Sequence, residues 1–183
     1  MPAKCTEPWS DFWFPLEGCY RRQGITWVPP ERIEPSDIPA PYQQLMVHED
    51  DMTPTLSRYY NDSILIQCLF SQMEGSDYCR EVVLCLHSTG KQVEWGGIRI
   101  FLDRLPSEVQ ERILQERLPL GDILQQYAVA HHSRPMGFFR MRPNDHIRAV
   151  LGPSEASWLY GRRNRLTEPS GAPLAEIIEI LPA

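Results

Sequence analysis

Between residues 63 and 182, apolar and polar positions alternate with a period of two in six separate segments. Such alternation is typical of β-strands that bury one face. The six segments are 63–72, 78–88, 91–103, 136–143, 157–168 and 172–182. Turn sequences separate most of them, and Gly96-Gly97 in the third indicates a bulge or a close approach of another backbone. We therefore predict six strands that follow one another largely as hairpins.

Helix signals surround these strands. Pro41 and Pro106 occupy helix-start positions, and Asn61 is placed to end a helix. The predicted helices span 42–50, 52–60, 106–116 and 118–129, the last starting near Gly121-Asp122. The last two lie between the third and fourth strands. The predicted fold class is α+β: a six-stranded antiparallel sheet with helices packed on one side, enclosing an internal ligand pocket.

The first 41 residues differ from the rest of the chain in composition. They hold eight of the 17 prolines together with six aromatic residues. Proline interrupts regular ladders, whereas aromatic side chains favour burial. We therefore predict an irregular N-terminal arm over 1–41 that packs on a domain formed by 42–183.

Composition excludes several classes of function. The 183 residues carry a formal net charge of −6, which argues against the basic face that a nucleic-acid-binding protein presents. No apolar run reaches the roughly 20 residues of a membrane span, and the N-terminus lacks the pattern of a secretory signal. The five cysteines form no CxxC pair, and the histidines show no metal-ligand spacing. We expect a cytoplasmic protein with free thiols and no metal.

Charged residues fall at positions where strands bury side chains. Alternation places Arg80 on one face with Val82 and Leu84, where a guanidinium needs an anion, either a structural carboxylate or a ligand. In the last strand, Glu176 and Glu179 lie on opposite faces. One of the two can therefore be buried, where its pKa would be raised.

The fifth strand carries three arginines. Arg163 and Arg165 share one face, and Arg162 lies on the other. Cross-strand ion pairs with Glu168, Glu176 or Glu179 explain them in the simplest way. An anion site is the alternative.

Five segments in order resemble the chorismate lyases (chorismate–pyruvate lyases). They are LMVHEDDMTPTL, YCREVVLCL, LPLGDIL, LYGRRNRL and SGAPLAEIIEILP, and the resemblance covers about residues 42–182. It implies a six-stranded antiparallel sheet and elimination of pyruvate from chorismate to give 4-hydroxybenzoate, without cofactor or metal. By this resemblance Arg80 binds a substrate carboxylate, the final-strand Glu contacts the ether region, and Met52 and Leu120 help hold the ligand. Such an enzyme would feed a quinone or another aromatic pathway.

Two departures from the family pattern leave alternatives open. The catalytic carboxylate corresponds to Glu179, which we favour, or to Glu176. The better-known branch of the family has Gly-Arg where this chain reads WGGIRI, so Arg99, Arg162 or Arg163 would take over any role of that arginine.

Three functions are therefore considered. The first is the chorismate lyase, and the second is a sister enzyme that makes another hydroxybenzoate. The third is a non-enzymatic domain that binds a small aromatic carboxylate, because the same fold serves as the effector domain of some bacterial regulators. The expected partner is a small molecule in every case, rather than nucleic acid or membrane.

Overall fold

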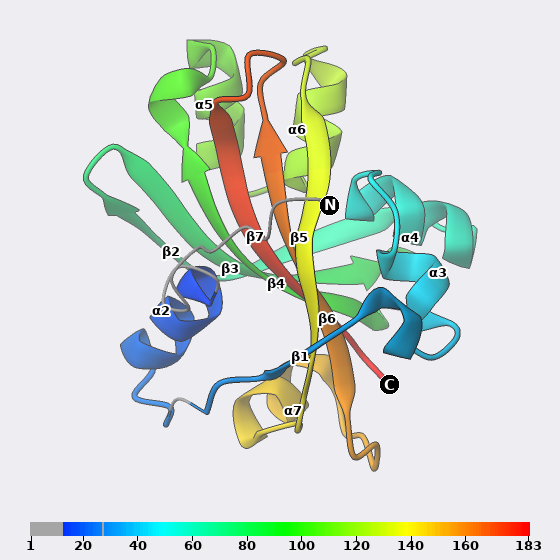
Figure 1. Cartoon of the computed structure of the whole chain (residues 1–183). Helices are drawn as coiled ribbons and strands as arrows, with labels where there is room; N and C mark the ends of the chain where they lie inside the picture. The colour runs from blue at the N-terminus through cyan, green and yellow to red at the C-terminus, as the bar shows by residue number, and fades with distance from the viewer. Residues whose placement is uncertain (1–12, 27) are drawn as a thin grey trace, which may run out of the picture.

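A computed structural model describes residues 13–26 and 28–183 (Figure 1). Its centre is one seven-stranded antiparallel sheet with the strand order β1-β5-β6-β7-β4-β3-β2. Two meanders, β2-β3-β4 and β5-β6-β7, join where β4 pairs with β7. The strands are β1 (Glu31–Ile33), β2 (Ile64–Glu74), β3 (Asp77–Leu86), β4 (Gln92–Phe101), β5 (His132–Met141), β6 (Leu159–Thr167) and β7 (Pro173–Leu181).

The predicted antiparallel α+β class is confirmed, and the sheet has one strand more than the six expected. The additional strand, β1, pairs Glu31 with Arg140 at the edge of β5. Three residues are too short to show an alternation of apolar and polar positions, so their pairing depends on β5 rather than on a local pattern.

The helices cover both faces of the sheet, whereas the sequence analysis predicted helices on one face only. They are α2 (Phe14–Arg22), α3 (Tyr42–Met46), α4 (Met52–Tyr60), α5 (Ser107–Leu114), α6 (Leu120–Gln126) and α7 (Asp145–Leu151), with single 3₁₀ turns at Pro35–Asp37 and Leu102–Arg104. The four predicted helices, α3 to α6, lie toward one face. α2 and α7 pack on the other face against Trp95, Ile178 and Ile180.

α2 corrects the expectation of an irregular arm. Pro15 stands in the first turn, where a missing N–H costs no helical hydrogen bond, so this proline starts a helix instead of preventing one. The backbone of α2 approaches Gly97 of β4, because a Cβ built there would lie 3.5 Å from the carbonyl oxygen of Pro15 and 3.4 Å from the Cys19 sulfur. This confirms the predicted close approach. Within the predicted arm, residues 1–12 and Trp27 lie outside the described residues.

α7 was absent from the predicted elements. The Asn144 side chain caps it by accepting a hydrogen bond from the backbone N–H of Ile147 at 2.9 Å. Beneath it, Glu81 of β3 is buried and accepts hydrogen bonds from Trp95 Nε1 at 2.7 Å and Gln23 Nε2 at 2.5 Å. His146 Nε2 lies 2.6 Å from the same carboxylate. This polar cluster belongs to the face that α2 and α7 cover.

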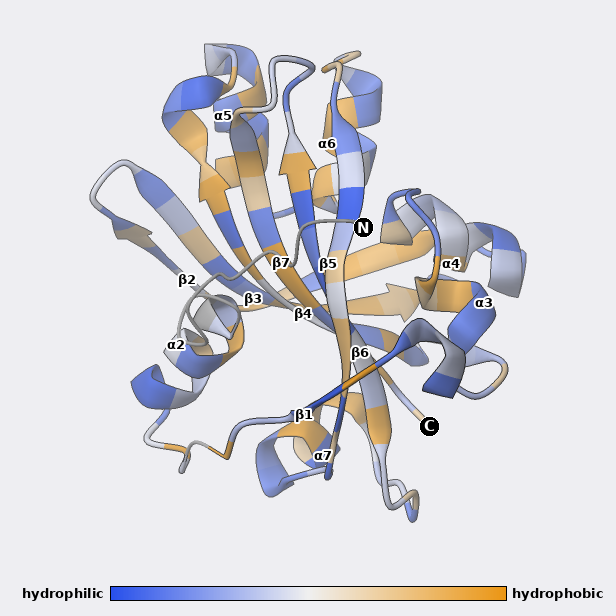
Figure 2. Ribbon diagram, viewed as in Figure 1, coloured by the Kyte–Doolittle hydropathy of each residue, from blue (hydrophilic) through white to orange (hydrophobic). Residues whose placement is uncertain are grey.

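The opposite face carries the candidate site residues. Figure 2 shows hydrophilic bands that interrupt the apolar stretches of the central strands. α5 and α6 pack with Ile98, Ile100 and Ala175 at one end of this face, and α3 and α4 pack with Leu84 and Leu181 at the other. The space between these two helix pairs lies over the middle of the sheet.

Candidate functional site

A cavity lies on this face, between the sheet and the first residues of α4 and α6. It offers about 60 Å³ to the centres of water molecules, several times the roughly 10–15 Å³ that one water needs. Its aliphatic lining comes from all four central strands and β2: Ile66, Val82, Leu84, Ile98, Leu166 and Ile177, with Met52 and Leu120 above them. Its polar lining consists of Asp51, Thr53, Arg80, Glu94, Asn164 and Glu179.

All four residues that the lyase resemblance singles out line this one cavity: Met52, Arg80, Leu120 and Glu179. They come from α4, β3, α6 and β7. Glu176 instead faces the opposite side of β7, where Arg163 Nη2 and Arg165 Nη2 lie 3.3 and 2.8 Å from its carboxylate. Strand parity thus places Glu179 inward, while the role of each residue in binding or catalysis stays a prediction.

Arg80 is buried in the wall of the cavity and has no carboxylate partner among the described residues. Its side chain is 2 % exposed, and its Nε and Nη1 atoms have no hydrogen-bond partner. Nη2 reaches only the carbonyl oxygen of Leu118, at 3.5 Å. Burial lowers the pKa of this guanidinium. No described carboxylate forms an ion pair with Arg80, although the Glu116 charge acts on it from a longer distance, and Nε and Nη1 are left to meet an anion in the cavity.

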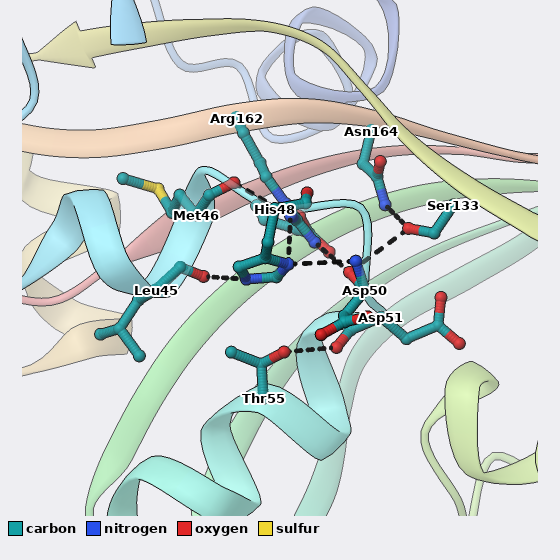
Figure 3. Close-up of polar contacts among 10 residues, drawn as sticks. Leu45, Met46, His48, Asp50, Asp51, Thr55, Ser133, Arg162 and Asn164 are labelled. Carbon is teal, nitrogen blue, oxygen red and sulfur yellow. Dashed lines mark hydrogen bonds and ion pairs between the residues drawn. The ribbon is translucent and has the colours of Figure 1, made fainter. Parts of the chain in front are cut away.

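Arg162 is fully buried on the cavity face and is held in several directions (Figure 3). Its Nε donates to Glu179 Oε2 in a short ion pair. Its terminal nitrogens donate to the carbonyl oxygens of Met46, His48 and Asp50 at 3.1, 3.2 and 3.3 Å. Arg162 thereby fixes to the sheet the segment that leads into α4, and it neutralises Glu179. Of the three arginines proposed to replace the Gly-Arg of the lyases, it is the one beside the cavity.

Glu94 is a second buried carboxyl group, which the sequence analysis did not single out. Burial raises its pKa well above the ordinary 4.5, and the neighbouring Glu179 charge raises it further, whereas Arg162 opposes the shift. The shift favours the neutral form of Glu94, and its Oε2 has no hydrogen-bond partner. The alternation of β4, which places Glu94 on the same face as Gly96 and Ile98, carried the signal for this position.

Asp51 and Asn164 complete the polar lining, and both were also missed. Asp51 Oδ2 lies 2.8 Å from His131 Nε2, and this contact raises the pKa of the imidazole. Asn164, 1 % exposed, donates from Nδ2 to Ser133 Oγ at 2.9 Å. Nothing in the local sequence marks these residues, because the partners of Asp51 and Asn164 lie 80 and 31 positions away.

Comparison with known proteins identifies the fold through structure alone. No family model and no curated protein sequence matches the chain. The structure matches PhnF from Mycobacterium smegmatis with a TM-score of 0.57 at 10% identity, over 74% of this chain and 64% of that one. The chain has the chorismate lyase-like fold. That fold is shared by the effector domains of GntR-family regulators.

The match is confined to part of PhnF. The effector domain of PhnF alone gives a TM-score of 0.55 at 11% identity, over 72% of this chain and 87% of that domain. A gene product of Staphylococcus aureus, SA0254, gives 0.51 at 8% identity, over 65% of this chain and 83% of that one. The chain therefore spans less than two thirds of full-length PhnF. Because the identities are so low, these structural matches establish the fold only.

The described part of the chain holds neither a candidate membrane helix nor a candidate metal site. Within residues 13–26 and 28–183, no helix is long and apolar enough to cross a membrane. Over the same ranges, no three His, Cys, Asp or Glu side chains are grouped so that they could hold a metal ion. Four cysteines, Cys19, Cys68, Cys79 and Cys85, are free thiols, and Cys5 lies outside the described residues.

Proposed function

We propose that this chain binds a small organic carboxylate in the cavity, with Arg80 as its anion ligand. One observation carries the proposal: a buried guanidinium faces an aliphatic cavity and has no carboxylate partner in the described part of the chain. A buried charge without an ion-pair partner is costly, and a bound carboxylate would supply a counter-charge and accept charge-assisted hydrogen bonds.

The remaining charges around the cavity favour a ligand with a single negative charge. Glu179 is paired with Arg162, and Asp51 is paired with His131. Burial and the Glu179 charge raise the pKa of Glu94, which favours its neutral form. Arg80 is thus the cavity residue whose charge has no ion-pair partner, and only the more distant Glu116 charge acts on it. The aliphatic lining suits a ligand whose body is apolar, such as an aromatic ring.

Calorimetric titration of the protein with benzoate and with 4-hydroxybenzoate tests this function. Arg80→Met should weaken binding about 10- to 100-fold, because charge-assisted hydrogen bonds contribute about 1.5–3 kcal/mol. The affinity of Arg80→Lys should lie between those of the parent and Arg80→Met, since lysine keeps the charge and loses the planar guanidinium. Arg104→Met, at an exposed position, serves as the control. Equal affinities of Arg80→Met and the parent, or no binding of either compound to the parent, would refute the proposal.

A second candidate is a lyase that acts on chorismate and releases pyruvate and 4-hydroxybenzoate. It is favoured by the convergence of Met52, Arg80, Leu120 and Glu179 on one cavity. Chorismate is a dianion, so its second carboxylate would need a second cation, and Arg162 would have to bind it together with Glu179. The reaction requires orientation and exclusion of water rather than a cofactor. A cytoplasmic location suits either candidate.

Incubation of the protein with chorismate, followed by chromatography, separates the two candidates and identifies the hydroxybenzoate isomer. If Glu179 takes part in the elimination, Glu179→Gln should lower turnover about 10²–10⁴-fold. Glu176→Gln, on the opposite face of β7, is the matched control and should retain activity. If the parent binds carboxylates but does not turn over chorismate, the chain is a binding domain.

A further inference from the structure

His131 lies directly before β5, and both nitrogens of its imidazole ring contact oxygen atoms. Nδ1 is 2.9 Å from the carbonyl oxygen of Val129, and Nε2 is 2.8 Å from Oδ2 of Asp51. A carbonyl oxygen and a carboxylate oxygen only accept hydrogen bonds, so both ring nitrogens have to donate. A neutral imidazole has one N–H group, whereas the imidazolium has two. The geometry therefore fits the positively charged form of His131.

The carboxylate that His131 meets belongs to the cavity. Asp51 comes directly before α4 and lines the cavity, and its other oxygen, Oδ1, is buried without a hydrogen-bond partner. Figure 3 shows Asp51 where the segment that follows His48 enters α4. A Cβ built at Gly121 would lie 3.6 Å from the Cβ of Asp51, so the start of α6 covers the same side chain. The Asp51 charge is thus held between the starts of α4 and α6, where it can act on an anion in the cavity.

Little water reaches the pair of His131 and Asp51. The two side chains are 15 % and 18 % exposed, so solvent screens their charges weakly. The hydrogen bond with Asp51 raises the pKa of His131 above the ordinary 6.5, and burial opposes this shift. Asp51 is the only charged side chain in the described part of the chain that contributes to it. The protonation of His131 and the charge of Asp51 are therefore directly linked.

Other ionisable groups lie on the elements around this pair. They are the ion pairs Asp50–Arg58 and Glu179–Arg162, Arg80 on β3, Glu94 on β4, Asp122 on α6, and the exposed His132 and Arg134 on β5. Burial raises the pKa of Asp122, and no charged neighbour adds to that shift. Glu94 lines the same cavity, and its Oε2 has no partner. Ionisation of Glu94 would also act on a bound anion, so a test has to separate Glu94 from His131.

The charge that a ligand meets in the cavity depends on the state of His131. When His131 is protonated, it neutralises Asp51, and Arg80 is left to attract an anion. When His131 is neutral, the Asp51 carboxylate brings a negative charge that opposes a bound carboxylate. Two unit charges about 10 Å apart, at an effective dielectric constant of about 20, change an affinity roughly 15-fold. The proton on His131 therefore has a measurable effect on anion binding.

We propose that His131 is a specificity-determining residue: its protonated form neutralises Asp51 and so lets the cavity accept an anion. His131 does not line the cavity, and it acts through Asp51. The inference rests on the proposed function and adds its control by pH. Anion affinity is highest below the pKa of His131 and falls as pH rises through that value. By linkage, a bound anion also holds the proton on His131 more tightly.

Calorimetric titration with benzoate from about pH 6 to about pH 9 tests this inference. The affinity of the parent should fall about 5- to 20-fold over this range. His131→Gln carries no positive charge, so it should bind weakly at every pH and lose this fall. Asp51→Asn removes the charge that His131 neutralises, so it should bind more tightly than the parent at high pH. His132→Gln, at the neighbouring exposed position, is the matched control and should follow the parent.

An NMR titration of His131 in the parent measures the same coupling without any substitution. Saturating benzoate should raise the pKa of His131, by about one pH unit for each tenfold ratio of the two affinities. This measurement stands even if a variant does not fold. An unchanged pKa of His131 would overturn the inference.

The pH profiles also separate the inference from the proposed function. A fall in affinity that persists in His131→Gln would arise from another group, such as Glu94, and would overturn the role of His131. Binding of benzoate with the same affinity at every pH would overturn that role and leave the anion site in place. If benzoate binds at no pH, the proposed function itself fails.

Discussion

The buried pair of Arg162 and Glu179 allows a prediction in which the two partners respond unequally. Arg162→Met leaves the Glu179 carboxylate, 3 % exposed, without a cation. It also removes the donor to the carbonyl groups of Met46, His48 and Asp50. Loss of one member of a buried ion pair costs about 3–5 kcal/mol, so we expect the free energy of unfolding to fall by about that amount.

Glu179→Gln should cost less, about 1–2 kcal/mol, for two reasons. Arg162 keeps its three carbonyl acceptors in this variant. In addition, the Glu179 charge is one of the causes that raise the pKa of Glu94, so its removal lowers that pKa and favours a Glu94 carboxylate as the counter-charge of Arg162. The double variant Glu94→Gln, Glu179→Gln removes this second carboxyl group. Its loss of unfolding free energy should exceed the sum of the losses in the two single variants by about 0.5–3 kcal/mol.

Urea unfolding, followed by circular dichroism and tryptophan fluorescence, measures all four proteins against the parent. The dependence of the free energy on urea should stay constant, because the surface exposed on unfolding is nearly unchanged. Two results would contradict the reasoning. One is a Glu179→Gln variant as unstable as Arg162→Met, and the other is simple additivity of the two Gln substitutions.

Three further measurements test other parts of the structure. Gly161→Ala places a methyl group against the Phe139 ring and 2.5 Å from the carbonyl oxygen of Glu179, so it should lower stability by about 1–3 kcal/mol in thermal or urea unfolding; unchanged stability would contradict this packing. Asp51→Asn should lower the pKa of His131 toward 6.5 in an NMR titration, because Asp51 raises it. The parent pair stabilises the fold at low pH, and this contribution is lost as pH rises through the raised pKa of His131. Burial raises the pKa of Cys19 to about 12, so alkylation mapped by mass spectrometry should spare this thiol until the protein is unfolded.

Much of the fold could be predicted because its signals are local. The alternation in each strand needs no distant partner, and it located the six long strands and set Glu176 and Glu179 on opposite faces of β7. The same rule separated Arg162 from Arg163 and Arg165. Helix starts at Pro41 and Pro106 and the left-handed Asn61 that ends α4 are likewise properties of a few adjacent residues.

Other features depend on the assembled sheet. β1 has too few residues to form a pattern and exists through β5, and α2 was hidden by a proline that its first turn tolerates. Which charge is paired was also decided by tertiary structure. Alternation placed Arg80 on an apolar face, but only the positions of distant strands determine that no described carboxylate reaches it.

The lining of the cavity likewise includes residues that the sequence pointed to and residues that only the tertiary structure revealed. Sequence alone pointed to Met52, Arg80, Leu120 and Glu179, because a resemblance can carry single positions across. It did not point to Glu94, Asn164 or Asp51, whose importance comes from an oxygen that stays buried and unpartnered once the fold is complete. Local periodicity sets the direction of a side chain, whereas its protonation and its unsatisfied hydrogen bonds are set by neighbours that the chain brings in from far along the sequence.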